Sequence, residues 1–246
     1  MPIIGIIGGS GLASLQGLSD ASQRLQKTPY GEHSGILTTG NFNDRKVVFL
    51  ARHGNPHVIP PHKINYRANI WALREVGAEK IIAINAVGGI TAVMQPGVLA
   101  IPDQIIDYTW GRGHTFFEDG LNNVVHVDCT HPYSSDLRRL IIRAGDTCGI
   151  SLMPQATYGA TQGPRLETAA EIARMERDGC DLVGMTGMPE ATLARELDLD
   201  YASVCMVVNR AAGKTGDMIT MEIIEKYLGN CTTAVMRLLP ELLNLL

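Results

Sequence analysis

The sequence has no apolar run long enough to cross a bilayer. Its longest runs, such as Lys80–Ala86, have the length of a strand, whereas a transmembrane helix needs roughly 20 apolar residues. The first residues, MPIIGIIGGSG, lack the basic flank and the long apolar centre of a secretory signal. We therefore expect a soluble, cytoplasmic protein that has no membrane partner.

An excess of positive charge is also missing. The chain has 21 Lys and Arg residues against 25 Asp and Glu residues, which gives a formal net charge of −4. Both signs are interspersed along the sequence, and the pI is about 6.0. Nucleic acid is bound through a broad basic surface, so we expect no nucleic-acid partner.

Cysteines are few, and they do not form a metal or disulfide pattern. The five cysteines are odd in number, scattered and without CxxC spacing: Cys129, Cys148, Cys180, Cys205 and Cys231. This arrangement favours free, buried thiols over a disulfide framework or a zinc site. We expect no metal.

No linker, low-complexity tract or repeat divides the 246 residues, a length that suits one α/β domain. Short β-branched runs alternate with helical patterns. The predicted strands are Ile3–Ile7, Val47–Ala51, Lys80–Ala86, Asp181–Met185 and Tyr201–Val208. The predicted helices are Ala68–Val76, Thr168–Asp178 and Glu190–Leu197, followed by two closing helices, Asp217–Leu228 and Thr232–Leu246. This order predicts a single α/β domain over residues 1–246, with a mixed central β-sheet flanked by α-helices.

Two short segments have side chains suited to phosphate. Glycines in Gly8-Gly9-Ser10-Gly11 allow close backbone approach to an anion, and the Ser10 hydroxyl can donate to it. The segment matches neither GxGxxG nor the Walker spacing, so a tight turn without a ligand is an alternative. Arg52 and His53 add a guanidinium and an imidazole, although a surface salt bridge would also explain this pair.

A third segment, Asn85-Ala86-Val87-Gly88-Gly89, ends a predicted strand with two glycines. Missing side chains leave room for a flat ring beside the backbone, and a bulge in a core strand is the alternative. Met185 stands at the end of another predicted strand, where a thioether can pack on an apolar sugar face or simply in the core.

These segments occur together with GPRLET, GMTGMPE and VCMVVN. In this order the motifs resemble the trimeric purine nucleoside phosphorylase and methylthioadenosine phosphorylase family, from about Ile3 to Leu228. The resemblance implies that phosphate is bound by Ser10, Arg52, His53, Asn85, Ala86 and Thr186. It implies that the purine lies against Val87, Gly88 and Leu166 and that the ribose packs on Met185. Thr or Ser is more usual in the family where this chain has Asn85.

Glu167 and Asn209 indicate which purine is bound. A 6-oxopurine presents N1–H as a donor and O6 and N7 as acceptors, so Glu167 can accept from N1–H and Asn209 can donate to N7 or O6. Methylthioadenosine phosphorylases resembling this chain have Ser in place of Glu167 and aspartates in place of Asn209 and Ala211. The pair therefore predicts hypoxanthine or guanine, unless Glu167 only caps the dipole in the first turn of the following helix.

Two further residues concern the 5′ end of the sugar. Purine nucleoside phosphorylases have a His on the late helix for the 5′-hydroxyl, but residues 217–224 contain none, and Met221 with Ile224 could form an apolar pocket for a methylthio group. His57 matches a position from which family members reach a neighbouring subunit, although it could be a surface-loop residue. The resemblance implies a homotrimer.

The sequence thus predicts an enzyme that cleaves S-methyl-5′-thioinosine with phosphate, giving hypoxanthine and 5-methylthioribose 1-phosphate. Asn209, Glu167 and His53 are the predicted catalytic residues, inorganic phosphate is the co-substrate, and no cofactor is expected. Inosine and guanosine are the second choice of substrate and methylthioadenosine is the third. A nucleosidase that uses water and a catalytically idle nucleoside-binding protein are the alternative classes.

Overall fold

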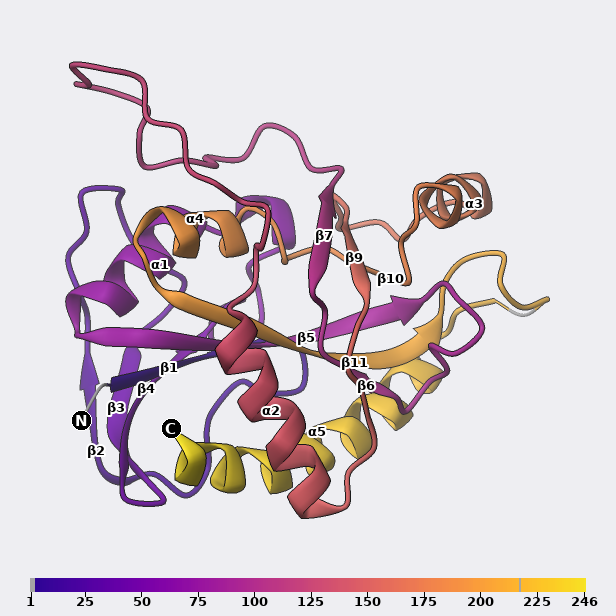
Figure 1. The fold of residues 1–246 in the computed structure, drawn as a ribbon, viewed down its shortest axis with the longest axis horizontal. Helices are drawn as coiled ribbons and strands as arrows, with labels where there is room; N and C mark the ends of the chain where they lie inside the picture. The colour runs from indigo at the N-terminus through magenta and orange to yellow at the C-terminus, as the bar shows by residue number, and fades with distance from the viewer. Residues whose placement is uncertain (1–2, 217) are drawn as a thin grey trace.

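A long strand, β5 (Ala78–Gly89), forms the centre of the fold in the computed structural model, which describes residues 3–216 and 218–246. It pairs in parallel with β1 (Ile3–Gly8) on one side and β11 (Asp200–Arg210) on the other. β4 (Arg45–Ala51) continues the parallel set beyond β1, whereas β10 (Leu182–Gly184) runs antiparallel to β5. The sheet crosses the molecule from end to end (Figure 1).

Shorter strands extend this sheet at both ends. They are β2 (Ser19–Arg24), β3 (Leu37–Phe42), β6 (Leu99–Ala100), β7 (Gln104–Asp107), β8 (Leu152–Met153) and β9 (Thr157–Ala160). The main order is β2-β3-β4-β1-β5-β10-β9-β7, and β11 joins β5 to β6 and β8. Parallel and antiparallel pairs occur in one sheet, so the predicted mixed α/β architecture is confirmed.

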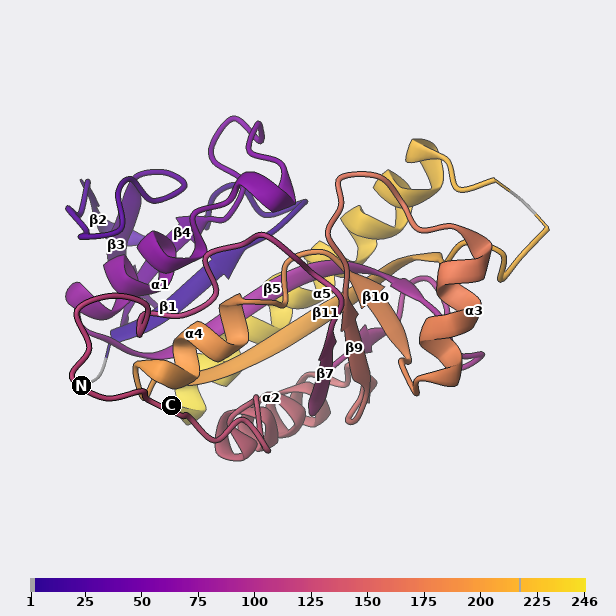
Figure 2. The same cartoon turned by 90° about the horizontal axis from the view of Figure 1, so that it is seen from above.

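Helices cover both faces of the sheet. α1 (Tyr66–Glu75), which follows a 3₁₀ turn at Pro61–Lys63, and α4 (Glu190–Glu196) lie on one face, and α2 (Ser135–Cys148) and α5 (Met221–Leu245) lie on the other (Figure 2). α3 (Ala169–Arg177) stands near β10, at the end of the sheet. Buried side chains on α5 recur at helical spacing: Val235, Leu238, Leu239, Leu242 and Leu243. Each stabilises the fold by roughly 1.5–3 kcal/mol relative to an exposed position.

Polar side chains define where several helices begin. Thr168 accepts a hydrogen bond from the Glu171 backbone, and the Glu171 side chain accepts one from the Thr168 backbone, which together form a capping box. Asn65 and Ser134 cap α1 and α2 in the same way from their side chains. Glu167 therefore precedes the capping residue of α3, and the acidic residue in the first turn of that helix is Glu171.

The predicted strands and the three predicted inner helices are present, with ends that shift by up to three residues. The expectation of two closing helices is wrong, because one continuous helix spans Met221–Leu245. Residues 229–231, Gly-Asn-Cys, suggest a break in the sequence, but packing against β11 and α2 carries the helix across them. Asp217, where the first of these helices was expected to begin, lies outside the described residues. α2 was not predicted.

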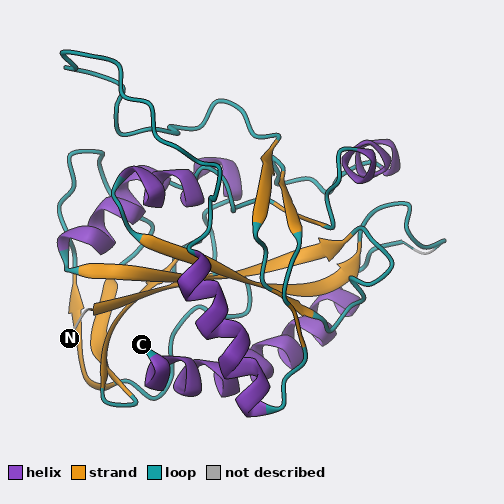
Figure 3. Cartoon of the chain, viewed as in Figure 1, coloured by secondary structure: helices purple, strands orange, loops and turns teal. Residues whose placement is uncertain are grey.

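The parallel strands β1, β4, β5 and β11 end at the same edge of the sheet. Gly8 pairs with Ala51, and Val207 pairs with Val87, near these ends. Loops follow each strand at this edge, and a long loop between β7 and α2 extends away from the body of the molecule (Figure 3). In open α/β sheets ligands bind outside the carboxyl ends of the strands. Among the described residues, no helix combines the length and apolar character that crossing a membrane requires.

Candidate active site

A cavity of about 250 Å³ lies at this edge of the sheet. It brings together residues from the ends of β1, β4, β5, β10 and β11 with residues from the loops that follow. The predicted residues that line it are Ser10, Arg52, His53, His57, Ala86, Val87, Gly88, Leu166, Glu167, Met185, Thr186, Asn209 and Ala211. Two predicted residues, Asn85 and Met221, lie outside this lining.

Arg52 is fully buried at one end of the cavity. Its Nε and Nη2 donate to the two carboxylate oxygens of Glu190 at 2.8 Å each, and its Nη1 donates to the Ile84 carbonyl at 2.9 Å. Burial alone would lower the pKa of Arg52, but the Glu190 carboxylate raises it above its ordinary value. A guanidinium has five N–H groups, so three are engaged and two are left for a ligand. Arg52 and Glu190 form a buried ion pair, so Arg52 does not take part in the surface salt bridge that was the alternative for it.

Glu190 was not singled out in the sequence. It is the first residue of α4, it is fully buried, and it also accepts a hydrogen bond from the Tyr201 hydroxyl at 2.8 Å. Burial, and next the Glu190 charge, raise the pKa of Tyr201 well above its ordinary value, so this hydroxyl stays a donor. Glu190 thus fixes the plane of the Arg52 guanidinium. The sequence did contain a signal for Glu190, because a carboxylate that is buried among apolar residues needs a charged partner, and GMTGMPE ends in such a carboxylate.

Asn85 lies behind the cavity wall and acts on Thr186. Its Nδ2 donates to the Thr186 hydroxyl oxygen at 2.9 Å, and its Oδ1 accepts from the Ser203 hydroxyl at 2.8 Å. Because the Thr186 oxygen already accepts one hydrogen bond, its own proton is free to point into the cavity. Asn85 thus contacts Thr186 and Ser203, and its direct contact with phosphate stays a prediction.

His53 and His57 stack beside Arg52, with ring centroids 4.3 Å apart. Burial, followed by the charge of Arg52, lowers the pKa of His53 to about 4, so its ring is neutral at pH 7. Nδ1 lies 2.8 Å from the Ile59 carbonyl and must be the protonated nitrogen of the neutral ring. Nε2 is then an acceptor. The structure places His57 in the cavity of its own chain, and the subunit-crossing role implied by the resemblance stays a prediction.

Two glycines are required by close approach rather than by turn geometry. A Cβ on Gly9 would lie 2.5 Å from the Ile84 carbonyl oxygen and 2.9 Å from Arg52 Nη1, so only glycine lets this loop pass over the guanidinium. Gly89 was expected to leave room for a flat ring, but a Cβ there would instead meet the Met94 carbonyl oxygen at 1.8 Å. Gly88 lines the cavity, whereas Gly89 makes room for the chain's own backbone.

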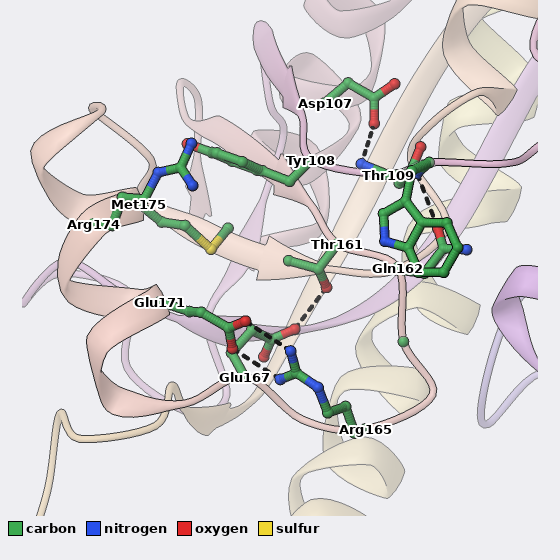
Figure 4. Close-up of a pocket in the computed structure, with 12 residues that line it drawn as sticks. Asp107, Tyr108, Thr109, Thr161, Gln162, Arg165, Glu167, Glu171, Arg174 and Met175 are labelled. Carbon is green, nitrogen blue, oxygen red and sulfur yellow. Dashed lines mark hydrogen bonds and ion pairs between the residues drawn. The ribbon is translucent and has the colours of Figure 1, made fainter.

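Glu167 and Asn209 also line the cavity. Glu167 Oε1 accepts a hydrogen bond from the Thr161 hydroxyl at 2.6 Å, which leaves Oε2 available to a ligand (Figure 4). Asn209 Nδ2 donates one N–H to the Arg210 carbonyl at 2.8 Å and retains a second. Glu167 also borders a neighbouring hollow of about 460 Å³, in which Arg165 pairs with Glu171 (Figure 4).

A bulge in β11 brings Asn209 to this position. Val207 pairs with Val87 and Asn209 pairs with Gly88, so Val208 is an extra residue in the strand. Successive residues of a regular strand point to opposite faces, but Val208 and Asn209 both line the cavity. A bulge was the alternative expected at Gly88 and Gly89, in β5, whereas the irregularity lies in the partner strand.

Part of the cavity wall is apolar. Met185 and Leu166 contribute to it, and Ile219 and Ile224 from the segment before and within α5 close one side. Ile224 thus lies where an apolar pocket was expected, but Met221 is 65% exposed and Ile219 takes the place predicted for it. In the described part of the chain, no group of three or more His, Cys, Asp or Glu side chains could hold a metal ion.

The geometry therefore defines a class: an α/β protein in which one cavity joins a buried guanidinium, apolar side chains and the polar groups of Glu167 and Asn209. The model of the phosphorylase superfamily matches residues 3–244. The chain belongs to this superfamily.

Individual relatives agree with this assignment. The chain is 54% identical to a Pseudomonas syringae pv. tomato protein named "Probable S-methyl-5'-thioinosine phosphorylase", over 93% of each chain. It is 49% identical to the 6-oxopurine nucleoside phosphorylase of Pyrococcus furiosus, over 92% of this chain and 86% of that one. The solved structure of Schistosoma mansoni methylthioadenosine phosphorylase in complex with adenine superposes with a TM-score of 0.95 at 31% identity, covering 100% and 92% of the two chains.

Proposed function

We propose that this protein is a nucleoside phosphorylase that cleaves S-methyl-5′-thioinosine with inorganic phosphate, releasing hypoxanthine and 5-methylthioribose 1-phosphate. The observation that carries the proposal is that Arg52, His53, Glu167 and Asn209 all line one cavity. The names of relatives at 54% and 49% identity support the reaction and the 6-oxopurine base.

Phosphate would bind to the two free N–H groups of Arg52, the Thr186 hydroxyl and the Ser10 segment. His53 Nε2, as an acceptor, would take a hydrogen bond from a protonated phosphate oxygen. A phosphate oxygen then forms a bond to C1′ of the sugar while the bond from C1′ to N9 breaks, and the electron pair of that bond leaves with the purine. Because charge separates along the cavity, catalysis rests on positioning and electrostatic stabilisation.

The departing base would be recognised by Glu167 and Asn209. Glu167 Oε2 would accept N1–H, and the second N–H of Asn209 would stabilise the negative charge at N7 or O6. Adenine offers a lone pair at N1, which would face the carboxylate. The apolar side formed by Ile219 and Ile224 favours a methylthio group over a 5′-hydroxyl, so inosine and guanosine are the second candidates.

The direct test measures purine release from methylthioinosine, inosine, guanosine and methylthioadenosine, each with and without phosphate. We expect release that requires phosphate and is fastest with methylthioinosine. Release without phosphate would make the protein a nucleosidase, and equal kcat/KM for methylthioinosine and methylthioadenosine would contradict the base assignment. We further propose that the enzyme is a cytoplasmic homotrimer that needs no cofactor.

A further inference from the structure

Arg112 is a buried arginine next to the cavity that neither the sequence nor the proposed chemistry accounts for. It lies near the start of the long loop between β7 and α2 and is 8% exposed. Its Nη1 donates to the carbonyls of Met185 at 2.8 Å and Met188 at 2.5 Å, and its Nη2 donates to the carbonyls of Thr161 at 3.2 Å and Gln162 at 2.9 Å. Its Nε donates to the Gln162 side-chain oxygen at 3.2 Å.

These acceptors belong to two separate loops. Residues 161–167 carry Leu166 and Glu167 to the base end of the cavity, and residues 185–188 carry Met185 and Thr186 to its sugar and phosphate ends. Thr161 links the guanidinium to Glu167, because its carbonyl accepts from Arg112. Its hydroxyl donates to Glu167 (Figure 4). The loops also touch, since a Cβ on Gly163 would lie 2.5 Å from Met185 Sδ.

The chemistry of this contact requires arginine. None of the oxygens that Arg112 contacts in the described part of the chain belongs to a carboxylate, so the side chain is not there to neutralise an acid. Only a guanidinium presents five donors in one rigid plane, which lets it hold two peptide segments at once. A lysine ammonium could satisfy one loop but not both.

We propose that Arg112 is a positioning residue that fixes the base-binding loop, residues 161–167, against the sugar- and phosphate-binding loop, residues 185–188. It sets the distance between the groups that bind the two reactants, and through Thr161 it aims Glu167 at the base. This inference rests on the proposed function. Loss of the Arg112 side chain should lower the reaction rate and weaken the base preference together, since a displacement of about 1 Å can lower a rate by roughly 10²-fold.

Arg138 offers a matched control. It also holds backbone carbonyls, those of Pro102, Ile101 and Pro154, but it lies on α2 away from the cavity. We would compare R112A and R138A for unfolding, for kcat and KM, and for the ratio of kcat/KM between methylthioinosine and methylthioadenosine. R138A should lose stability but keep wild-type kinetics. R112A should lose roughly 10²-fold in kcat/KM for methylthioinosine and part of its base preference.

Chemical rescue separates positioning from general support of the fold. Millimolar guanidinium should restore part of the R112A activity by filling the vacated site and should leave R138A unchanged. If R112A does not fold, R112K and T161V take its place, and both should reduce the preference for the 6-oxopurine.

Wild-type kinetics in R112K and T161V, or the same kinetic loss in R112A and R138A, would overturn the inference. A wild-type enzyme that releases no purine with phosphate would instead overturn the proposed function, so the two failures are distinguishable.

Discussion

Replacing Arg52 with Ala tests the phosphate end of the cavity. Two of its five N–H groups are free for a ligand, because Glu190 and the Ile84 carbonyl engage the other three. A hydrogen bond to a charged group contributes roughly 1.5–3 kcal/mol, so two such bonds contribute about 3–6 kcal/mol. At about 1.4 kcal/mol for each factor of ten, kcat/KM for phosphate should fall by roughly 10²- to 10⁴-fold.

The same substitution leaves Glu190 buried without its partner. Breaking a buried ion pair from one side costs about 3–5 kcal/mol, a large share of the 5–15 kcal/mol that typically holds a domain together. The matched variant is therefore R52M combined with E190Q, which removes both charges and keeps an acceptor for the Tyr201 hydroxyl. We expect it to be more stable than R52A but equally poor in phosphate use.

The assay is steady-state purine release, first at varied phosphate and saturating nucleoside and then at varied nucleoside and saturating phosphate. Unfolding by urea is measured in parallel. The phosphate KM should rise far more than the nucleoside KM in both variants. A folded double variant whose phosphate KM stays within about twofold of the wild type, well below the effect of even one such bond, would give Arg52 a purely structural role.

Three further predictions concern the base, pH and assembly. N209D with A211D, and E167S added if needed, should shift activity toward methylthioadenosine, and a folded variant with no adenine release above background would contradict our account of the base end. The pKa of His53 falls from 6.5 in the unfolded chain to about 4 in the folded one, so folding loses stability as pH falls below 6.5. Between pH 7 and pH 5 the wild type should lose about 2 kcal/mol more than H53Q in urea unfolding, and equal losses would refute the shift. Light scattering at assay concentration should give about three times the 26.6 kDa chain mass, and a fully active monomer would end the trimer proposal.

Much of the fold could be predicted because local patterns and tertiary packing agree. The β-branched runs before Gly8, Ala51 and Gly89 became parallel strands, and Thr168 capped the helix that follows it. α2 was not predicted, although Ser134 marks its start, Gly149 marks its end and its apolar residues recur at helical spacing. The helix break expected near Gly229 is absent for a different reason. Packing of the long apolar face of α5 outweighs the cost of one glycine in a helix, about 1 kcal/mol.

The lining of the cavity was predictable to a similar extent, but its supporting contacts were not. Glu190, Ser203 and Thr161 are not among the residues that line the cavity, and Glu190 and Ser203 lie 138 and 118 residues from Arg52 and Asn85, which they contact. Their roles depend on which donors and acceptors meet after folding, and residue type does not encode that. Asn85 illustrates the limit, because the same amide could face phosphate or Thr186, and the contact with Thr186 forms only when β10 pairs with β5.

The extra residue in β11 gives the end of this strand an unequal tolerance to genetic change. Substitutions at Asn209 or Ala211 alter the chemistry of one wall while the backbone path stays the same. Deleting Val208 would remove the bulge but leave Asn209 opposite Gly88, so the later side chains would keep their faces. Arg210, which donates to the carbonyls of Ile90, Thr91 and Met94, would still pair with Gly89. Substrate choice can therefore drift by point mutation, and this place should tolerate the loss of one residue better than a regular strand would.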